Sequence, residues 1–215
     1  MKPPPVWRLR GALPHLLCSM AALCNLLSCI SAPSWRTIIK RIALLLQPED
    51  RVLEIAAGTG IIALGLADRM QNIDAIDFSP SMVAKAQKKA QHLGLANVHF
   101  SAQNACDLRF APGSFDAVII CNTLHIMPEP EKALAESHRV LKPDGRLIAP
   151  TFVHAGSKKA LLFFALMSLS GLRAYHKWTQ QSFHAFLEEN AFTVLDSVLL
   201  KASFPLAYVV ARPKQ

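Results

Sequence analysis

Hydrophobic and polar positions follow two rhythms along residues 49–215, short apolar runs and longer amphipathic segments. The apolar runs predict strands at 51–56, 73–77, 98–101, 115–121, 145–151, 192–200 and 204–211. The amphipathic segments have the period of a helix and lie at 61–70, 80–93, 131–141 and 178–189. Strands that alternate with helices predict an α/β domain, in which a parallel, doubly wound sheet is covered by helices on both faces.

The last two predicted strands break this alternation. Only Lys201, Ala202 and Ser203 separate them, and a parallel crossover needs a much longer connection. They must therefore form an antiparallel hairpin. The expected fold is a Rossmann-like, doubly wound sheet of seven strands, mostly parallel, with an antiparallel hairpin at its C-terminal edge.

The first 35 residues have a different character. No charged side chain occurs from Gly11 to Trp35, and basic residues stand on both sides of this stretch. Three interpretations stay open: a helix that covers the active site, a membrane anchor, and a cleaved targeting or transit sequence. We treat residues 1–35 as a separate apolar segment with basic flanks and residues 36–215 as the domain.

Composition and charge exclude several classes of protein. The chain is 52% hydrophobic and 18% charged, which is too apolar for a disordered chain. Its net charge of +8 comes largely from six basic residues before Glu49, where no acidic residue occurs, so the body is almost neutral. We interpret the lysines at 85, 88, 89, 158 and 159 as solvated helix faces and expect no nucleic-acid partner.

The cysteines predict neither a disulfide framework nor a metal centre. There are five, an odd number, and none belongs to a C-x-x-C pair. A reducing compartment fits this pattern best. We expect no metal ion and a cytoplasmic location, with membrane association through residues 11–35 or an organelle matrix as the alternatives.

The loop that follows the first strand carries the candidate chemistry. Ligands of open parallel sheets bind beyond the carboxyl ends of the strands. Here the strand contains Glu54 and continues into Gly58 and Gly60, which let the backbone turn tightly and approach a ligand closely. Asp77 ends the second strand, and a carboxylate at that place can accept hydrogen bonds from both hydroxyls of a ribose. The pattern predicts a nucleoside pocket.

These residues resemble the class I S-adenosylmethionine-dependent methyltransferases, in particular those of the ubiquinone and menaquinone type. The stretches that resemble family motifs are residues 54–60, 76–82, 104–108, 114–118 and 139–145. The resemblance extends from about residue 50 to 151, the hairpin carries it to the end, and it does not cover residues 1–35. It implies S-adenosyl-L-methionine as cofactor, held by Glu54, Ala56, Gly58, Gly60, Asp77, Phe78, Asn104, Ala105 and Cys121.

Two departures and two alternatives accompany this resemblance. Ala56 stands where the family has its first glycine, and Asn104 replaces a common aspartate, although its amide oxygen can still accept a hydrogen bond. Residues 58–63 also satisfy the G-x-G-x-x-A pattern of nicotinamide dehydrogenases. That pattern does not call for Glu54 or for the terminal hairpin.

A non-catalytic protein with the methyltransferase fold, acting as a binding protein or scaffold, is the other alternative.

Candidate groups for the methyl acceptor follow the later strands. His125 and His154 are the candidate catalytic residues, and Tyr175 with His176 are candidates for substrate binding. Residues 161–172 are apolar and too short to span a bilayer. Together with the N-terminal segment they favour a small, apolar acceptor, such as a quinone precursor or a lipid, and peripheral membrane contact. The sequence does not fix the oligomeric state.

Overall fold

The computed structural model describes residues 32–153, 175–200 and 205–215. Within these ranges the strands are β1 Val52–Ile55, β2 Ile73–Asp77, β3 Val98–Ala102, β4 Phe115–Ile120, β5 Leu141–Ile148, β6 Thr151–Phe152, β7 Phe192–Leu200 and β8 Leu206–Pro213. The helices are α2 Ala32–Ala43, α3 Ile61–Leu66, α4 Pro80–His92, the short 3-10 helix η2 Leu124–Ile126, α5 Pro130–Val140 and α7 Gln180–Glu189.

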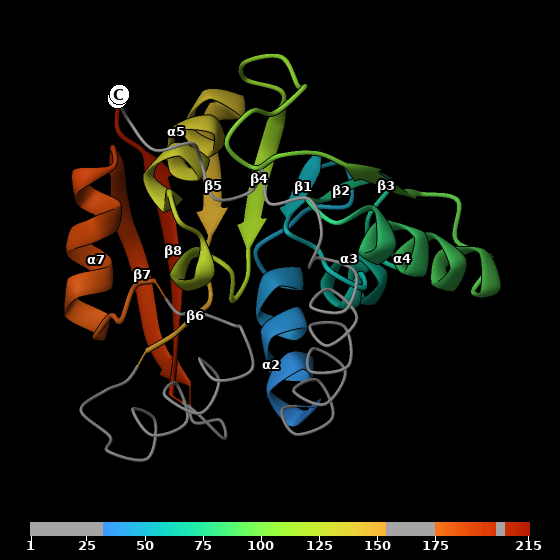
Figure 1. Cartoon of the computed structure of the whole chain (residues 1–215), viewed down its shortest axis with the longest axis horizontal. Coiled ribbons are helices and arrows are strands. Elements are labelled where there is room, and N and C mark those ends of the chain that lie inside the picture. Colours follow the sequence, from blue (N-terminus) through green and yellow to red (C-terminus); the bar gives the residue numbers. More distant parts are fainter. Residues whose placement is uncertain (1–31, 154–174, 201–204) are drawn as a thin grey trace, which may run out of the picture.

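The strands form one mixed sheet in the order β3-β2-β1-β4-β5-β8-β6, with β7 on the free side of β8. β1 to β5 pair in parallel, whereas β8 runs antiparallel to β5, β6 and β7 (Figure 1). This arrangement confirms the predicted doubly wound sheet and its C-terminal hairpin. The point where the strand order reverses lies between β1 and β4, as a ligand site at that place requires.

The described residues contain eight strands rather than the seven expected. The difference arises because the predicted fifth strand is interrupted at Ala149 and Pro150 into β5 and β6, both of which pair with β8. Proline has no backbone N–H and interrupts a ladder of hydrogen bonds. The extra strand is therefore a division of the predicted one and leaves the topology unchanged.

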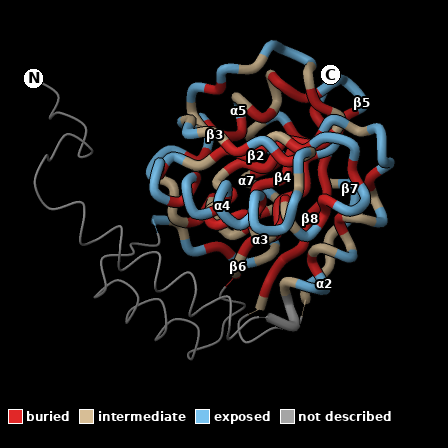
Figure 2. Tube along the Cα trace, turned by 90° about the vertical axis from the view of Figure 1, so that its right-hand side faces the viewer, coloured by how far each residue is buried: buried red, intermediate tan, exposed pale blue. Residues whose placement is uncertain are grey.

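Two apolar clusters cover the two faces of the sheet. One joins α2, α3 and α4 to side chains such as Val52 and Ile119, and the other joins α5 and α7 to their neighbours Leu53 and Val118. Successive strand residues point to opposite faces, so continuous apolar strands are what a sheet buried on both sides requires. Figure 2 shows the strands as the buried interior of the molecule.

Helix α2 packs on the sheet beside α3. Ile38 and Ile42 are buried on one side of α2, and Ile39 lies against α3 where a Cβ on Gly65 would come within 2.7 Å of its Cδ1. The small residue therefore permits the close approach of the two helices. None of the helices in the described residues is long and apolar enough to cross a membrane. α2 begins before the predicted domain boundary at residue 35, and the boundary itself stays a prediction.

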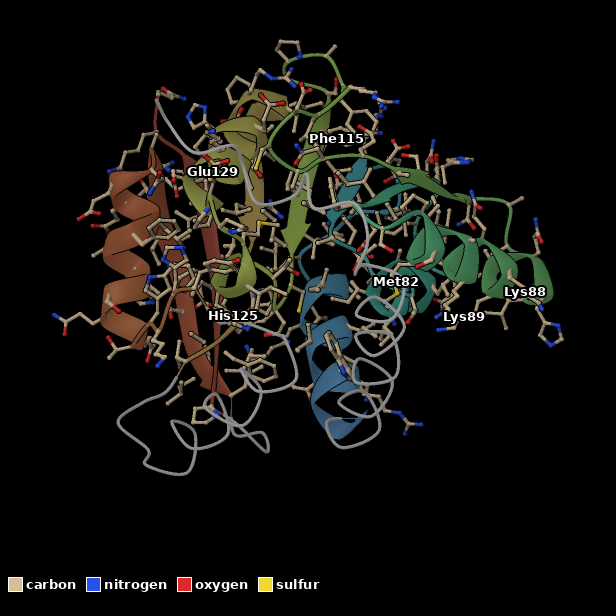
Figure 3. All side chains as sticks on the ribbon, viewed as in Figure 1. Met82, Lys88, Lys89, Phe115, His125 and Glu129 are labelled. Atoms are coloured by element: carbon tan, nitrogen blue, oxygen red, sulfur yellow. The ribbon has the colours of Figure 1, made fainter. Side chains whose placement is uncertain are left out.

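Several sequence predictions lie outside the described residues. They are the apolar stretches at 1–31 and 161–172, His154 and the lysines at 158 and 159. The lysines on α4 belong to the described residues. Lys85, Lys88 and Lys89 are exposed, as predicted for a solvated helix face. Figure 3 shows Lys88 and Lys89 along the outer side of α4.

Candidate active site

A tight loop joins β1 to α3 at the carboxyl edge of the sheet. Ala56, Gly58 and Gly60 all adopt left-handed backbone conformations, with φ of 58°, 56° and 78°. The two glycines differ in their surroundings. A Cβ on Gly58 would meet nothing within 4 Å, whereas a Cβ on Gly60 would lie 2.7 Å from the Phe100 ring. Gly60 is needed for packing, and Gly58 leaves an open space beside the loop.

Ala56 occupies a conformation that glycine adopts without strain. A left-handed φ costs an L-residue with a Cβ about 1–2 kcal/mol. The position that departs from the family pattern thus has the backbone conformation that a glycine would favour. The turn is kept in spite of the substitution, and Ala57 N–H still donates to Ile76 O at 2.9 Å to join the loop to β2.

Asp77 connects the two loops of the predicted nucleoside pocket. Its Oδ2 accepts a hydrogen bond from Gly58 N–H at 2.8 Å, and its Oδ1 accepts one from Ser79 N–H at 2.9 Å. Each carboxylate oxygen has two lone pairs, so each can accept a further hydrogen bond, from a hydroxyl group. Partial burial raises the pKa of Asp77 above its ordinary value, against the effect of the two N–H donors. The carboxylate is fixed at the place where a ribose would bind.

Glu54 is a carboxyl group inside the core. Its side chain is 3% exposed, and Oε2 accepts a hydrogen bond from Ala63 N–H in the first turn of α3 at 2.9 Å. Burial raises the pKa of Glu54 to about 8, and the neighbouring Asp77 charge acts in the same direction. In the free protein the group is therefore largely protonated near neutral pH, and a cationic ligand would favour its ionised form.

The predicted adenine-binding residues follow the carboxyl ends of β2 and β3. Phe78 follows β2 and is 69% exposed, which leaves its ring free to pack on a planar base. Asn104 is exposed, and its Oδ1 accepts a bond from Cys106 N–H at 3.0 Å, so one lone pair of that oxygen is already used. Ala105 is half-buried against the α5 and α7 side of the core. These positions are compatible with the predicted contacts.

An ion pair on α5 supports the loop that carries Asn104. Arg139 donates to Leu108 O at 2.9 Å and to Phe110 O at 2.8 Å, and it binds Glu136 at 2.7 Å. The same Glu136 oxygen, Oε2, also accepts a hydrogen bond from Leu108 N–H at 2.8 Å. Arg139 belongs to the stretch that resembles the turn into the fifth strand, and in the structure its guanidinium holds the segment that follows Asn104.

Two further side chains follow β4, and one of them, Cys121, lies close enough to Glu54 for its charge to act on the thiol. Cys121 is 8% exposed, and burial together with the Glu54 charge raises the pKa of its thiol. Asn122 has a φ of 52°, and its N–H donates to Pro150 O at 2.8 Å. Both polar atoms of its amide are buried without a hydrogen-bond partner. Such atoms are costly to leave unpaired, so the amide is a candidate group for contact with a ligand.

His125 and His176 come together although fifty residues separate them. His176 N–H donates to His125 O at 3.1 Å, and the His176 ring stacks on Trp178 at 5.2 Å. Burial lowers the pKa of His125 to about 4, and His176 adds to this effect. Figure 3 shows His125 beyond the end of β4. Tyr175 is 54% exposed, and its neighbour His176 is half-buried.

Sequence reasoning missed four polar residues on this edge. Asn122, Thr151, Trp35 and Tyr208 each have a buried polar atom without a hydrogen-bond partner, as has His176. An asparagine directly after an apolar strand and a tyrosine within the apolar run 206–211 were visible signals. Their meaning depends on the absence of a partner, which a sequence does not show.

Comparison with known proteins decides the family. Residues 52–145 match the model of a methyltransferase domain. A demethylmenaquinone methyltransferase from Thermus thermophilus is 33% identical over 186 residues, which are 81% of this chain and 82% of that protein. The chain belongs to the class I S-adenosylmethionine-dependent methyltransferases. These matches favour the methyltransferase interpretation over the dehydrogenase alternative.

Two other matches extend this result. A ubiquinone/menaquinone biosynthesis C-methyltransferase from Sinorhizobium fredii is 41% identical over 106 residues, 47% of this chain and 41% of that protein. The match therefore spans less than half of that relative. A solved S-adenosylmethionine-dependent methyltransferase from Aquifex aeolicus has a TM-score of 0.67 at 21% identity, covering 85% of this chain and 90% of that structure. At that identity the likeness shows the fold alone.

The cofactor of this methyltransferase is S-adenosyl-L-methionine, and the site fits it. The open space at Gly58 admits a ligand close to the backbone, and the Asp77 carboxylate has acceptor capacity for two ribose hydroxyls. The buried carboxyl of Glu54 and the unpaired amide of Asn122 are polar groups that a charged methionine part would be able to contact. The assignment of each predicted contact residue stays a prediction.

Proposed function

We propose that the protein transfers the methyl group of S-adenosyl-L-methionine to a ring carbon of a quinone precursor. The observation that carries this proposal is the alignment with the Thermus demethylmenaquinone methyltransferase over four-fifths of both chains. The name of the Sinorhizobium relative, a C-methyltransferase, supports carbon as the methylated atom. Beyond the carboxyl end of β4, the buried His125 ring contacts the half-buried Phe152 ring edge-on, and this aromatic surface suits an aromatic acceptor.

The cofactor supplies an electrophilic methyl group, so the chain has to hold the acceptor close and in line with it. Asp77 would accept the ribose hydroxyls, Phe78 would pack on the base, and Glu54 would balance the positive charge of the cofactor. Asp77 and Glu54 are already fixed by hydrogen bonds of the free protein, whereas the Phe78 ring is exposed and free to pack on the base. Pre-organised groups reduce the entropy that binding has to overcome.

His125 is the proposed hydrogen-bond acceptor for the hydroxyl of the reduced ring. A pKa of about 4 keeps its imidazole neutral at physiological pH, so one ring nitrogen can accept a hydrogen bond from that hydroxyl. A hydrogen bond donated by the hydroxyl increases the electron density of the ring carbon that receives the methyl group. His176, next to it, would keep the acceptor hydroxyl in position.

Binding of the cofactor near pH 7 should release up to one proton. Glu54 is largely protonated in the free protein, and the positive charges of the cofactor lower its pKa, so the affinity of the wild type rises between pH 6 and 7. Calorimetry in two buffers of different ionisation enthalpy measures the number of protons released. The Glu54→Gln variant cannot lose that proton and should release fewer. Equal release by both proteins would contradict the role of Glu54.

The acceptor is tested by direct product analysis. The protein is incubated with S-adenosyl-L-methionine labelled in its methyl group and with a chemically reduced, demethylated naphthoquinone. We expect label on the ring carbon of the extracted quinone and, at a cofactor concentration below the wild-type Kd, at least about tenfold less labelled product from the Asp77→Asn variant. A folded wild-type protein that binds the cofactor and labels no quinone would sink the proposed acceptor class.

A further inference from the structure

The phenol of Tyr208 is a buried polar group that the reaction above does not use. Its side chain is 1% exposed, and its hydroxyl has no hydrogen-bond partner. Leu206 and Val210, two residues away on either side, belong to the same apolar cluster. A phenylalanine would fill this place without burying an unpaired hydroxyl, which destabilises a protein. The hydroxyl therefore needs an explanation outside the fold.

Tyr208 lies at the edge of the sheet where the acceptor binds. In β8 it stands between Val210, which pairs with Ile148 at the end of β5, and Ala207, which pairs with Thr151. Cys121, just after β4, lies in the same cluster and acts electrostatically on the phenol. Tyr208 thus faces the side of the sheet that also carries Glu54 and α3.

Trp35 on α2 is a second buried donor on this side. Its side chain packs against the cluster that contains Tyr208, and its indole N–H is buried without a partner. The Arg41 guanidinium lies over the Tyr208 ring, 5.7 Å from the centroid. Side chains of a helix point toward its N-terminus, so Arg41 brings the Tyr208 ring toward the turn that follows Trp35. The Tyr208 ring on β8 therefore lies beside the stretch of α2 that begins at Trp35.

We propose that Tyr208 and Trp35 form an oxygen-binding subsite that holds one ring oxygen of the acceptor and selects oxygenated rings over hydrocarbons of the same shape. The subsite rests on the proposed function, because it specifies which groups that acceptor must carry. An indole N–H only donates, so the bound atom is an acceptor such as a carbonyl or hydroxyl oxygen. Burial raises the pKa of Tyr208 above its ordinary value, so the phenol keeps its proton and donates as well.

The test compares two ligands of equal shape. Wild type and Tyr208→Phe, both saturated with S-adenosylhomocysteine, are titrated with dimethylnaphthoquinone, whose methylated ring carbons do not react with thiols, and with dimethylnaphthalene. We expect the wild type to bind the quinone at least about tenfold more tightly than the hydrocarbon. Tyr208→Phe should lose about tenfold in quinone affinity, keep its affinity for the hydrocarbon, and unfold at the same temperature or higher.

Trp35→Phe and Ser137→Ala complete the experiment. Trp35→Phe should weaken quinone binding in the same selective way. Ser137 is an equally buried hydroxyl on α5, but it donates to Ala133 O at 2.6 Å. Ser137→Ala should therefore lower the unfolding temperature and leave the preference for the quinone unchanged. Equal loss of both ligands in Tyr208→Phe, or no loss of either, would overturn the subsite.

The subsite and the proposed function can fail separately. Selective quinone binding that depends on Tyr208, without any labelled product in the transfer assay, would support the subsite and refute the proposed reaction. Product formation with the same KM for the quinol in wild type and Tyr208→Phe would refute the subsite alone. In the expected case the KM rises, and the affinity for S-adenosyl-L-methionine stays unchanged.

Discussion

Asp77→Asn is expected to weaken S-adenosyl-L-methionine binding by about 10- to 100-fold, because hydrogen bonds to a charged group contribute about 1.5–3 kcal/mol. The carboxylate accepts N–H bonds from Gly58 and Ser79 and keeps lone pairs for the ribose. In the asparagine side chain an NH₂ group replaces one carboxylate oxygen. This NH₂ group would face a backbone N–H and cannot accept a hydrogen bond from a ribose hydroxyl. Isothermal titration of the cofactor into the purified variant measures the loss.

Asp74→Asn is the matched control for this change. It lies on the same strand, three residues earlier, and forms an ion pair with the exposed Arg51 at 3.6 Å. Surface pairs of this kind contribute about 0–1 kcal/mol, so the variant should be nearly as stable as the wild type. Its cofactor affinity should stay within about twofold. An equal loss of affinity in Asp74→Asn and Asp77→Asn would mean that the effect is not specific to the site.

Gly60→Ala is expected to destabilise the fold by about 2–4 kcal/mol, which combines a left-handed alanine with overpacking. The added Cβ would lie 2.7 Å from Phe100 Cζ and 3.3 Å from Ala86 Cβ, both within the core. Chemical denaturation of the free protein measures this loss. A denaturation midpoint equal to that of the wild type would show that the loop tolerates the side chain.

Gly58→Ala separates packing from cofactor binding. Its Cβ would meet nothing within 4 Å, so the free protein should lose only about 1–2 kcal/mol from the left-handed φ. The same Cβ would project into the open space beside the loop, where we place the cofactor, and we expect a loss of cofactor affinity of about tenfold or more. The two glycine variants thus should show opposite balances of stability and binding. A Gly58→Ala variant with normal affinity would contradict the proposed position of the cofactor.

The fold was predictable because its signals are local. Apolar runs and helical periodicity gave the strands and helices, and the three-residue gap at 201–203 required the hairpin. The extra strand was not expected, since the apolar run 145–151 hides the effect of Pro150 on the ladder of hydrogen bonds. Such a break depends on which neighbour the residue faces.

The tight loop after β1 and its contact with Asp77 could be anticipated from the sequence, whereas the packing around His125 could not. Glu54, Gly58, Gly60 and Asp77 stand in one short pattern whose spacing carries chemical meaning. The contact of His125 with His176 joins distant segments, and tertiary packing alone creates it. The unpaired phenol of Tyr208 reads as an ordinary core residue in sequence, because only the structure shows that nothing inside the protein accepts or donates to it.

The central claim is that this loop binds S-adenosyl-L-methionine. Its most direct test is a calorimetric titration of the cofactor into the folded wild-type protein, with NADH titrated under the same conditions. We predict saturable binding of S-adenosyl-L-methionine with one site per chain and no heat of binding from NADH. Saturable binding of NADH, or no binding of S-adenosyl-L-methionine by a protein with a cooperative unfolding transition, would contradict the account.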